Sequence, residues 1–299
     1  MSNEKPDLEE EAEMKEGSGK EIDAANLKNI EATTFFSAKM QDSKVMKGII
    51  DAISAIIDET YFKANIDGLN LTAMDESHIC LMHMTLPKEL FDGFECDGEA
   101  KLGINLEDLV KIMNRAGKDD SIEFKHPTDS EKIQVLMKGA GTRAFSLRLV
   151  DIDEEKIPPT TELDVDFDAK ITVDSNILEQ AIKDAEIYQD TLEVKVTQEG
   201  LHFSAEGEVG DVSNDIDRDH LDDLNVKQDS RGVFSLAFLK NIMKMSALSQ
   251  KVTLNVANNA PLRFDFEFSG SDNSYAKGKV TYFLAPRVEE GDEDSYESD

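Results

Sequence analysis

Residues 43–58 read SKVMKGIIDAISAIID, and they are followed by TYFKANI at 60–66 and DGLNLTAMDE at 67–76. The first stretch repeats apolar residues at the three-to-four spacing of an amphipathic helix, and the next two have the composition of strands joined by a tight turn. This order decides the fold because it returns in the second half of the chain, as SNILEQAIKDAEIY at 175–188, TLEVKV at 191–196 and EGLHFSAEGE at 199–208.

Each half continues with a second helical segment and another strand. These are NLEDLVKIMNRAG at 105–117 with SIEFKH at 121–126, and LAFLKNIMKMSA at 236–247 with KVTLNV at 251–256. The pattern predicts a duplicated α+β domain in which helices cover one face of each sheet and keep a polar side free. We place the first domain at 34–150, the second at 164–288, and an extended connector with two prolines at 151–163 between them.

The chain is strongly acidic. Its 299 residues hold 32 Lys and Arg against 63 Asp and Glu, a formal net charge of −31. Residues 1–33 carry a net charge of −6 and residues 289–299 a net charge of −7, which leaves −18 on the residues between them. We interpret both ends as solvated acidic tails and expect the first to be disordered. This balance excludes a protein that coats nucleic acid with its whole surface, although a local basic face stays possible.

The distribution of apolar residues and the number of cysteines indicate that the protein stays inside the cell. The sequence has no apolar run of the roughly 18 residues that a membrane span needs, and its start lacks the apolar core of a signal peptide. Cys80 and Cys96 fit neither a disulfide framework nor a four-ligand zinc site. We therefore expect a soluble, unexported chain in a reducing compartment, with both cysteines acting as buried small hydrophobic residues.

The lysines are informative because they recur at matched places. Lys111 and Arg115 are four residues apart on the second helical segment of the first half, and Lys240 and Lys244 repeat this spacing in the second half. The first helical segments add Lys44, Lys47 and Lys183. Any one pair fits an ordinary solvated helix face, but their recurrence favours contact with phosphates without sequence preference, because no base-reading motif accompanies them.

Patterns typical of an enzyme are missing from the sequence. It contains no GxGxxG, GxxxxGK[ST], GxSxG or HExxH motif, and His78 and His83, five apart on an expected strand, would point to opposite faces. Asp164, Asp166 and Asp168 could attract a divalent ion as in a metal-dependent nuclease or phosphatase, but a solvent-facing strand edge explains them more simply. We predict a protein that is not an enzyme and has no cofactor or metal.

Three further stretches resemble one family. Residues 71–79, LTAMDESHI, are similar to the LxxMDxSHV segment of the sliding clamps of the proliferating cell nuclear antigen (PCNA) type. Residues 282–289, YFLAPRVE, resemble their YxLAP[RK]xE terminus, and 145–153, FSLRLVDID, resembles the strand that enters their interdomain connector. Together with the duplication, the resemblance covers residues 35 to about 290.

The resemblance implies a closed ring of three subunits, with antiparallel sheets outside and helices lining a central pore that holds double-stranded DNA. Lys44, Lys47, Lys111, Arg115, Lys183, Lys240 and Lys244 would then face the DNA, and the ring would tether DNA polymerase and other replication and repair proteins. The subunit interface would contain Arg143, Phe145, Leu147, Val212 and Ile216. A subunit of a heteromeric ring or a checkpoint-type clamp is the alternative.

The resemblance also implies a pocket for the short hydrophobic peptide motifs of polymerase, clamp loader, flap endonuclease and DNA ligase. Its expected residues are Met74, His78, Ile79, Ile157, Pro158, Pro261, Leu262, Phe283, Ala285 and Pro286. Such a clamp would work in the cytoplasm at the nucleoid if archaeal, and in the nucleus if eukaryotic.

Overall fold

The computed structural model describes residues 34–128, 130–153, 158, 163–270 and 276–287. The first repeat contains β1 (Thr34–Met40), α2 (Ser43–Ile53), β2 (Glu59–Asn65), β3 (Gly68–Met74), β4 (Cys80–Pro87), the 3₁₀ turn η1 (Lys88–Leu90), β5 (Gly93–Cys96), β6 (Ala100–Asn105), α3 (Leu106–Met113), β7 (Ser121–Pro127), β8 (Lys132–Lys138) and β9 (Thr142–Arg148).

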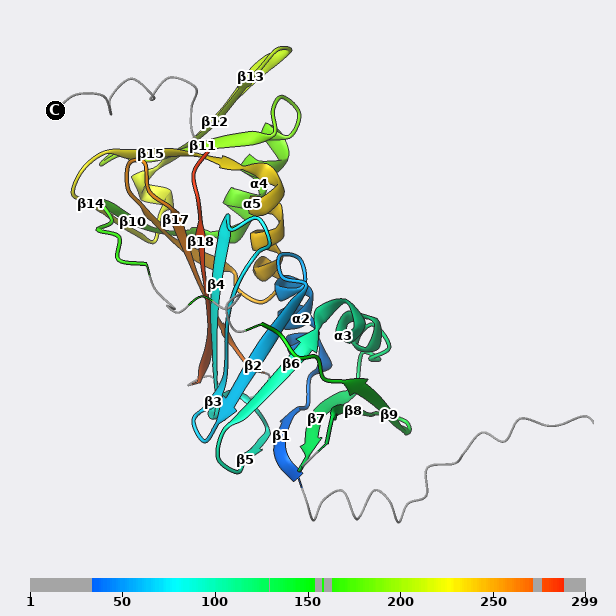
Figure 1. Cartoon of the computed structure of the whole chain (residues 1–299). Coiled ribbons are helices and arrows are strands. Elements are labelled where there is room, and N and C mark those ends of the chain that lie inside the picture. The colour runs from blue at the N-terminus through cyan, green and yellow to red at the C-terminus, as the bar shows by residue number, and fades with distance from the viewer. Residues whose placement is uncertain (1–33, 129, 154–157, 159–162, 271–275, 288–299) are drawn as a thin grey trace, which may run out of the picture. The chain divides into compact units, whose positions relative to one another are not determined.

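The second repeat follows the same order (Figure 1). It contains β10 (Ala169–Asp174), α4 (Ser175–Ala185), β11 (Thr191–Val196), β12 (Gly200–Gly207), β13 (Gly210–Asp217), η3 (Arg218–His220), β14 (Asp223–Val226), β15 (Ser230–Ser235), α5 (Leu236–Ile242), η4 (Met243–Ala247), β16 (Lys251–Val256), β17 (Leu262–Ser269) and β18 (Lys277–Leu284). The duplicated architecture expected from the sequence is confirmed. The connector lies largely outside the described residues, so its boundaries stay a prediction.

Matched backbone hydrogen bonds fix which residues of the two repeats correspond. The amide of Ser43 donates to the carbonyl of Asp120, as that of Ser175 donates to Gln250. After the last strand of each repeat, the amide of Val150 donates to Gly103, as that of Arg287 donates to Val233. These pairs align the repeats residue by residue, independently of side-chain identity.

The strands form three antiparallel sheets within the described residues. The sheet orders are β5-β1-β7-β8-β9, β14-β10-β16-β17-β18-β4-β3-β2-β6 and β13-β12-β11-β15. The middle sheet runs through both repeats because β18 pairs with β4, with Tyr282 opposite Met82 and Thr281 opposite His83. By contrast, β9 and β13 each end a sheet, so each has one edge that no strand of the described residues covers.

The helices begin where the sequence supplies a cap. The side chains of Asp42, Asn105 and Asp174 accept hydrogen bonds from backbone amides in the first turns of α2, α3 and α4. All four expected helices are shorter than their sequence patterns. Helices α2, α3 and α4 end at Ile53, Met113 and Ala185, and the segment 236–247 divides into α5 and the 3₁₀ turn η4. The last turn therefore tightens while its apolar side chains stay in the core.

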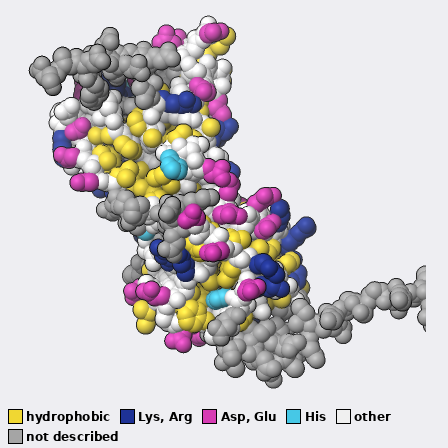
Figure 2. Space-filling view, in the orientation of Figure 1, with side chains coloured by type: hydrophobic (Ala, Val, Ile, Leu, Met, Phe, Trp, Pro, Cys, Tyr) yellow, Lys and Arg dark blue, Asp and Glu magenta, His cyan; other side chains and the backbone are white. Residues whose placement is uncertain are grey.

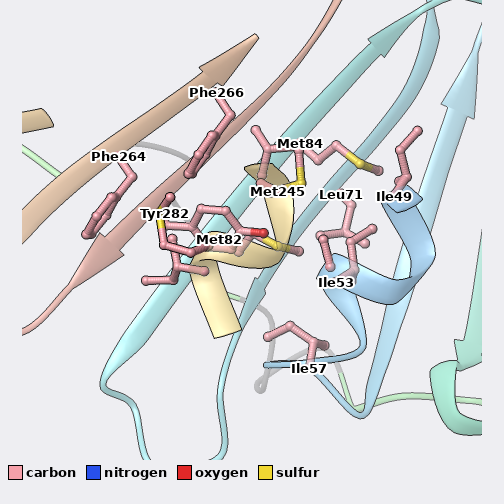
Figure 3. Packing of buried hydrophobic residues seen from close by; sticks show 14 of the residues in the cluster. Ile49, Ile53, Ile57, Leu71, Met82, Met84, Met245, Phe264, Phe266 and Tyr282 are labelled. Carbon is pink, nitrogen blue, oxygen red and sulfur yellow. The ribbon is translucent and has the colours of Figure 1, made fainter. Parts of the chain in front are cut away.

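One apolar core lies between the helices and the sheets. In Figure 3, Ile49 and Ile53 of α2 lie beside Leu71 of β3, and Met245 of η4 lies near Met82 and Tyr282. A Cβ on Gly48 of α2 would come within 2.9 Å of the Leu248 side chain, so α2 of the first repeat packs closely on the second. Burial of this apolar surface is the main stabilising term for the fold.

The cysteines differ from each other. Cys80 is buried as expected, and burial together with the Asp75 carboxylate raises the pKa of its thiol. Cys96 is only half-buried, so its expected burial is wrong; it lies at the end of β5, an edge strand, where its thiol donates to the carbonyl of Gly98 at 3.5 Å. None of the helices in the described part of the chain has the length and apolarity that crossing a membrane requires.

Candidate functional site

The seven basic residues expected to face DNA lie on or beside the helices. Six of them are exposed and Lys47 is half-buried. A groove of about 830 Å³ runs between the helices of the two repeats, and Lys183, Lys240 and Lys244 contribute to its lining with Asp51, Glu179 and Glu186. The structure thus brings three basic residues of the second repeat together with carboxylates of both repeats.

Four of the seven cations have carboxylate partners. Lys111 lies 2.9 Å from Glu107 and 3.0 Å from Asp108, and hydrogen bonds to these two residues raise the pKa of Lys111. Lys47 pairs with Asp51 at 2.7 Å, Lys183 with Glu179 at 3.3 Å, and Lys240 with Glu186 at 2.5 Å. Lys44, Arg115 and Lys244 form no ion pair with another described residue. Their charges are the ones most available to an external anion.

A second group of predicted residues meets at the turn between β3 and β4. The carbonyl of Ile79 accepts from the amide of Ala285 at 2.9 Å, which ties this turn to the chain after β18. Because opposite residues of an antiparallel pair share a face, Met74, Leu81, Phe283 and Arg263 form one row across β3, β4, β18 and β17. The Arg263 guanidinium lies 5.5 Å from the centre of the Phe283 ring.

The structure separates some of the expected pocket residues from this row. Leu262 shares its alternation with Phe264 and Phe266 and belongs to the core on the inner face, so it does not join this row, and its expected place in the pocket stays a prediction. Phe283 points to the opposite, outer face and is nevertheless buried. Pro158, Pro261 and Pro286 are half-buried, whereas Ile157 lies outside the described residues.

An open groove of about 800 Å³ adjoins the end of β3. One wall holds Met74, Asp75, Glu76 and His78, and another holds residues 151–153, with residues 56–60, Asn105 and Glu107 completing the lining. His78 has a φ of 58°, which places this non-glycine residue in the left-handed region. His78 therefore lies in a turn, and the strand expected for it is wrong.

Two residues outside the predicted site residues, Asp75 and Tyr61, hold these walls. The Asp75 carboxylate accepts from the amides of Ser77, Ile79 and Cys80 at 2.9, 2.7 and 2.6 Å. The Tyr61 hydroxyl accepts from the amide of Ile152 at 2.8 Å. An aspartate directly after a strand is a turn signal, so Asp75 could have been found from the sequence. Nothing local to Tyr61 indicates a partner so far along the chain.

The residues expected at a subunit interface lie on the two free edges. Phe145 is half-buried on β9, and Val212 and Ile216 are half-buried on β13. Leu147 is buried in the core of its own repeat, and the Arg143 guanidinium is bound by the Asp120 carboxylate and by the carbonyl of Arg115. Phe145, Val212 and Ile216 thus keep apolar surface available at the edges.

The aspartates considered for a metal do not form a strand. Asp164, Asp166 and Asp168 precede β10, so the expected strand edge is wrong; Asp166 pairs with Lys227 at 3.0 Å. In the described ranges, no group of three or more His, Cys, Asp and Glu side chains is arranged to hold a metal ion.

Comparisons with known proteins agree with this architecture. Residues 35–156 match the N-terminal domain of proliferating cell nuclear antigen, and residues 162–287 match its C-terminal domain. A solved structure of proliferating cellular nuclear antigen from Entamoeba histolytica superposes with a TM-score of 0.76 over 85% of this chain and 100% of that one, at 24% identity.

Two curated relatives are named DNA polymerase sliding clamp. The protein of Cenarchaeum symbiosum is 30% identical over 256 residues, 85% of this chain and 98% of that protein. The protein of Methanothermobacter thermautotrophicus is 29% identical over 254 residues, again 85% and 98%. The chain therefore belongs to the proliferating cell nuclear antigen family, whose N-terminal and C-terminal domains each occur once along it.

Proposed function

We propose that this chain is a sliding clamp: three copies close into a ring around double-stranded DNA and tether DNA polymerase and other replication and repair proteins. The family assignment supports this function, and the curated relatives carry the corresponding name. The clamp acts by holding its partners on DNA, and we expect it to catalyse no reaction. A single kind of chain suffices, and no comparison favours a heteromeric ring.

The main structural support for the ring is that β9 and β13 do not pair with each other within the chain. In the aligned repeats, β18 corresponds to β9 and β4 corresponds to β13. The pair β18 with β4 forms within the chain, but β9 and β13 lie at the ends of two different sheets. A second copy can supply the missing pair head to tail, and such a contact closes into a ring when its rotation allows.

The alignment also gives the register of this joint. Thr281 lies opposite His83, and Tyr282 lies opposite Met82. Their counterparts are Ala144 with Ser213 and Phe145 with Val212, each pair now formed between two copies. The half-buried apolar side chains of Phe145 and Val212 would then cover each other.

The charges on the helices suit a protein that must slide along DNA. Lys244, Lys44 and Arg115 offer free positive charge, whereas Lys111 and Lys240 are already paired. Partly neutralised lysines hold phosphates weakly and without sequence preference. The seven basic residues named for the pore remain our proposed DNA contacts, and the carboxylates among them limit the affinity.

The groove beside Met74 is our proposed site for partner peptides of polymerase, clamp loader, flap endonuclease and ligase. Met74 and His78 line it, and Ile79, Ala285 and the buried Phe283 lie around the same turn. A peptide with a glutamine, an aliphatic residue and two aromatic residues would place its apolar side chains against Met74, Ile79 and Ala285, and peptide affinity concentrates in a few such contacts.

Light scattering coupled to size exclusion tests the ring: we expect three times the chain mass of 33.3 kDa. Retention on bead-bound linear duplex DNA tests encirclement, because a ring slides off a free end and stays when that end carries a bulky block. Equal retention with and without the block would contradict encirclement, and a monomeric mass would contradict the self-assembled ring.

A further inference from the structure

The two walls of the groove beside Met74 are each held by one buried polar group. The first wall is the turn between β3 and β4, and the second is the chain that leaves β9 at residues 151–153. We propose that Asp75 and Tyr61 are positioning residues for partner-peptide binding, which fix these two walls at the separation the peptide needs. This inference rests on the peptide site proposed above.

Asp75 organises the first wall almost completely. Its side chain is 7% exposed, and its two carboxylate oxygens accept three backbone hydrogen bonds from residues 77, 79 and 80. Its own amide donates to the carbonyl of Cys80 at 3.1 Å, and its carbonyl accepts from the amide of His78 at 3.0 Å. A buried acceptor with several amide donors holds a turn in one conformation.

This conformation is not one that the turn residues would adopt freely. The φ of 58° at His78 is uncommon for a residue that is not glycine. The bonds to Asp75 stabilise it, and they present His78 to the groove while directing the carbonyl of Ile79 to Ala285. Loss of the carboxylate would therefore move a wall residue as well as remove hydrogen bonds.

Tyr61 holds the second wall through its hydroxyl. The hydroxyl accepts from the amide of Ile152 at 2.8 Å and donates to the Asp151 carboxylate at 2.8 Å or to the Ile152 carbonyl at 2.9 Å. The chain before this wall packs closely on the neighbouring strand β6, because a Cβ on Gly103 would lie 1.9 Å from the carbonyl oxygen of Val150. Val150 thus contacts the backbone of β6, and the hydrogen bonds of Tyr61 hold the next two residues, Asp151 and Ile152.

In the described part of the second repeat, neither an aspartate like Asp75 nor a tyrosine like Tyr61 occupies the matching position. The turn between β12 and β13 is a tight hairpin in which Gly207 pairs with Gly210, and Gly210 has a φ of 151°. The position matching Tyr61 is Glu193, whose carboxylate lies 3.3 Å from Arg231. The same fold therefore forms without these two groups, and they occur only in the repeat that carries the groove.

The chain offers a matched control for each substitution. Asp120 is also a buried aspartate, 9% exposed, and accepts from the amide of Gly117 at 2.6 Å, but it lies outside the groove lining. Tyr282 is fully buried, and its hydroxyl is without a hydrogen-bond partner among the described residues. Tyr282→Phe therefore removes the same atom as Tyr61→Phe without breaking a hydrogen bond.

The test is calorimetric titration of the glutamine, aliphatic and aromatic peptide described above into full-length wild type and four variants. Asp75→Asn and Tyr61→Phe should each weaken binding by about 10-fold, the effect of roughly one lost anchoring interaction. Asp120→Asn and Tyr282→Phe should bind within about twofold of wild type. Melting temperatures and ring mass are recorded for every variant.

A purely structural role gives a different result. It would lower the melting temperature of Asp75→Asn and Tyr61→Phe while leaving peptide affinity unchanged, and this outcome overturns the inference. Amide exchange gives an independent readout if Asp75→Asn is unstable: exchange at Ser77 and Ile79 should accelerate without a matching change at Gly117. A wild type that fails to bind the peptide would instead overturn the proposed peptide site itself.

Discussion

The pairing of β18 with β4 within the chain and the free edges of β9 and β13 occupy equivalent places in the two repeats, yet their side chains differ. At the first, Met82 and Tyr282 are fully buried on the inner face. At the second, the counterparts Val212 and Phe145 are half-buried. A contact made once during folding can be wholly apolar, whereas an edge that must stay soluble before assembly cannot.

On the outer face as well, the pairing of β18 with β4 is more apolar than the edges of β9 and β13. The row Met74, Leu81, Phe283 and Arg263 corresponds in the repeat alignment to Glu206, Asp211, Ser146 and Gln134. The free edge β13 also carries Asp215 and Asp217, and Asp215 lies 2.5 Å from His202. The apolar row thus occurs at the internal joint alone, which is consistent with one peptide site in each chain.

Acidic and basic side chains are interspersed over the face shown in Figure 2. On the helices, lysines form ion pairs such as Lys47 with Asp51 and Lys183 with Glu179. In a chain with a net charge of −31, such pairing would reduce the repulsion between the helices and the DNA of the proposed function.

The largest expected effect comes from placing a charge in the internal joint. Met82→Asp would bury an unpaired carboxylate in the core, at a cost of more than about 4 kcal/mol, so the chain should fail to fold. Val212→Asp, its counterpart, should leave a folded chain that no longer assembles. Circular dichroism and light scattering measure the two effects; folding of both or of neither would break the comparison.

The next effect concerns the peptide site. Met74→Ala should weaken binding of the partner peptide by about 10-fold to 100-fold, because removal of a buried anchor costs roughly 1.4 to 2.8 kcal/mol. The counterpart Glu206→Ala should leave affinity unchanged, since its row is polar. Calorimetric titration decides this, and a loss in Glu206→Ala alone would place the site in the second repeat.

A smaller effect is expected on DNA binding. Lys244→Ala removes an unpaired charge, whereas Lys111→Ala removes one already neutralised by Glu107 and Asp108. The slope of log affinity against log salt should fall by about 0.9 for Lys244→Ala, one phosphate contact, and by less for Lys111→Ala. Fluorescence anisotropy over a salt series measures both slopes, and equal slopes would show that the intrachain pairs do not limit DNA contact.

The smallest expected effect is an acid sensitivity at Glu123 of β7. Burial would raise the pKa of Glu123, but hydrogen bonds and charges from Lys138 and Lys125 outweigh it and hold this pKa below its ordinary value. The stabilisation is therefore present above pH of about 4.3 and is lost as pH falls through the lower, folded value.

Glu123→Gln tests this assignment. It should lower the melting temperature by about 1 to 3 °C at pH 7, and the difference from wild type should shrink as the pH falls below about 4. In the second repeat the corresponding residue is Thr253, which pairs with Thr172 at 2.8 Å, so Thr253→Val should show a difference that does not vary with pH. A Glu123→Gln difference that is constant with pH would contradict the ion-pair explanation.

Local patterns in the sequence were sufficient to predict the repeats. The apolar spacing in α2 and α4 and the caps at Asp42 and Asp174 are contained within a few residues of each helix. The alternation that buries Phe264 and Phe266 also places Leu262 on the inner face. Such features are decided by neighbours in sequence.

Features that depend on distant contacts could not be predicted in the same way. The sequence of β4 does not show that β18 will cover its second edge, nor does that of β13 show that its edge stays free within the chain. The shortening at η4 and the bond from Tyr61 to Ile152 likewise depend on packing between segments far apart in the chain. Tertiary contacts decide such positions, and the proposed functional surfaces lie at several of them.

Cross-linking in the predicted register tests the central claim most directly. In a Cys96→Ser background, Ala144→Cys combined with Ser213→Cys places two cysteines opposite each other across the joint, at the spacing of about 5 Å that a disulfide needs. Oxidation should give a covalently closed species of three chains. Ala144→Cys combined with Asp211→Cys is out of register by two residues and should cross-link far less. Efficient cross-linking of the shifted pair, or none in either, would contradict the joint between β9 and β13.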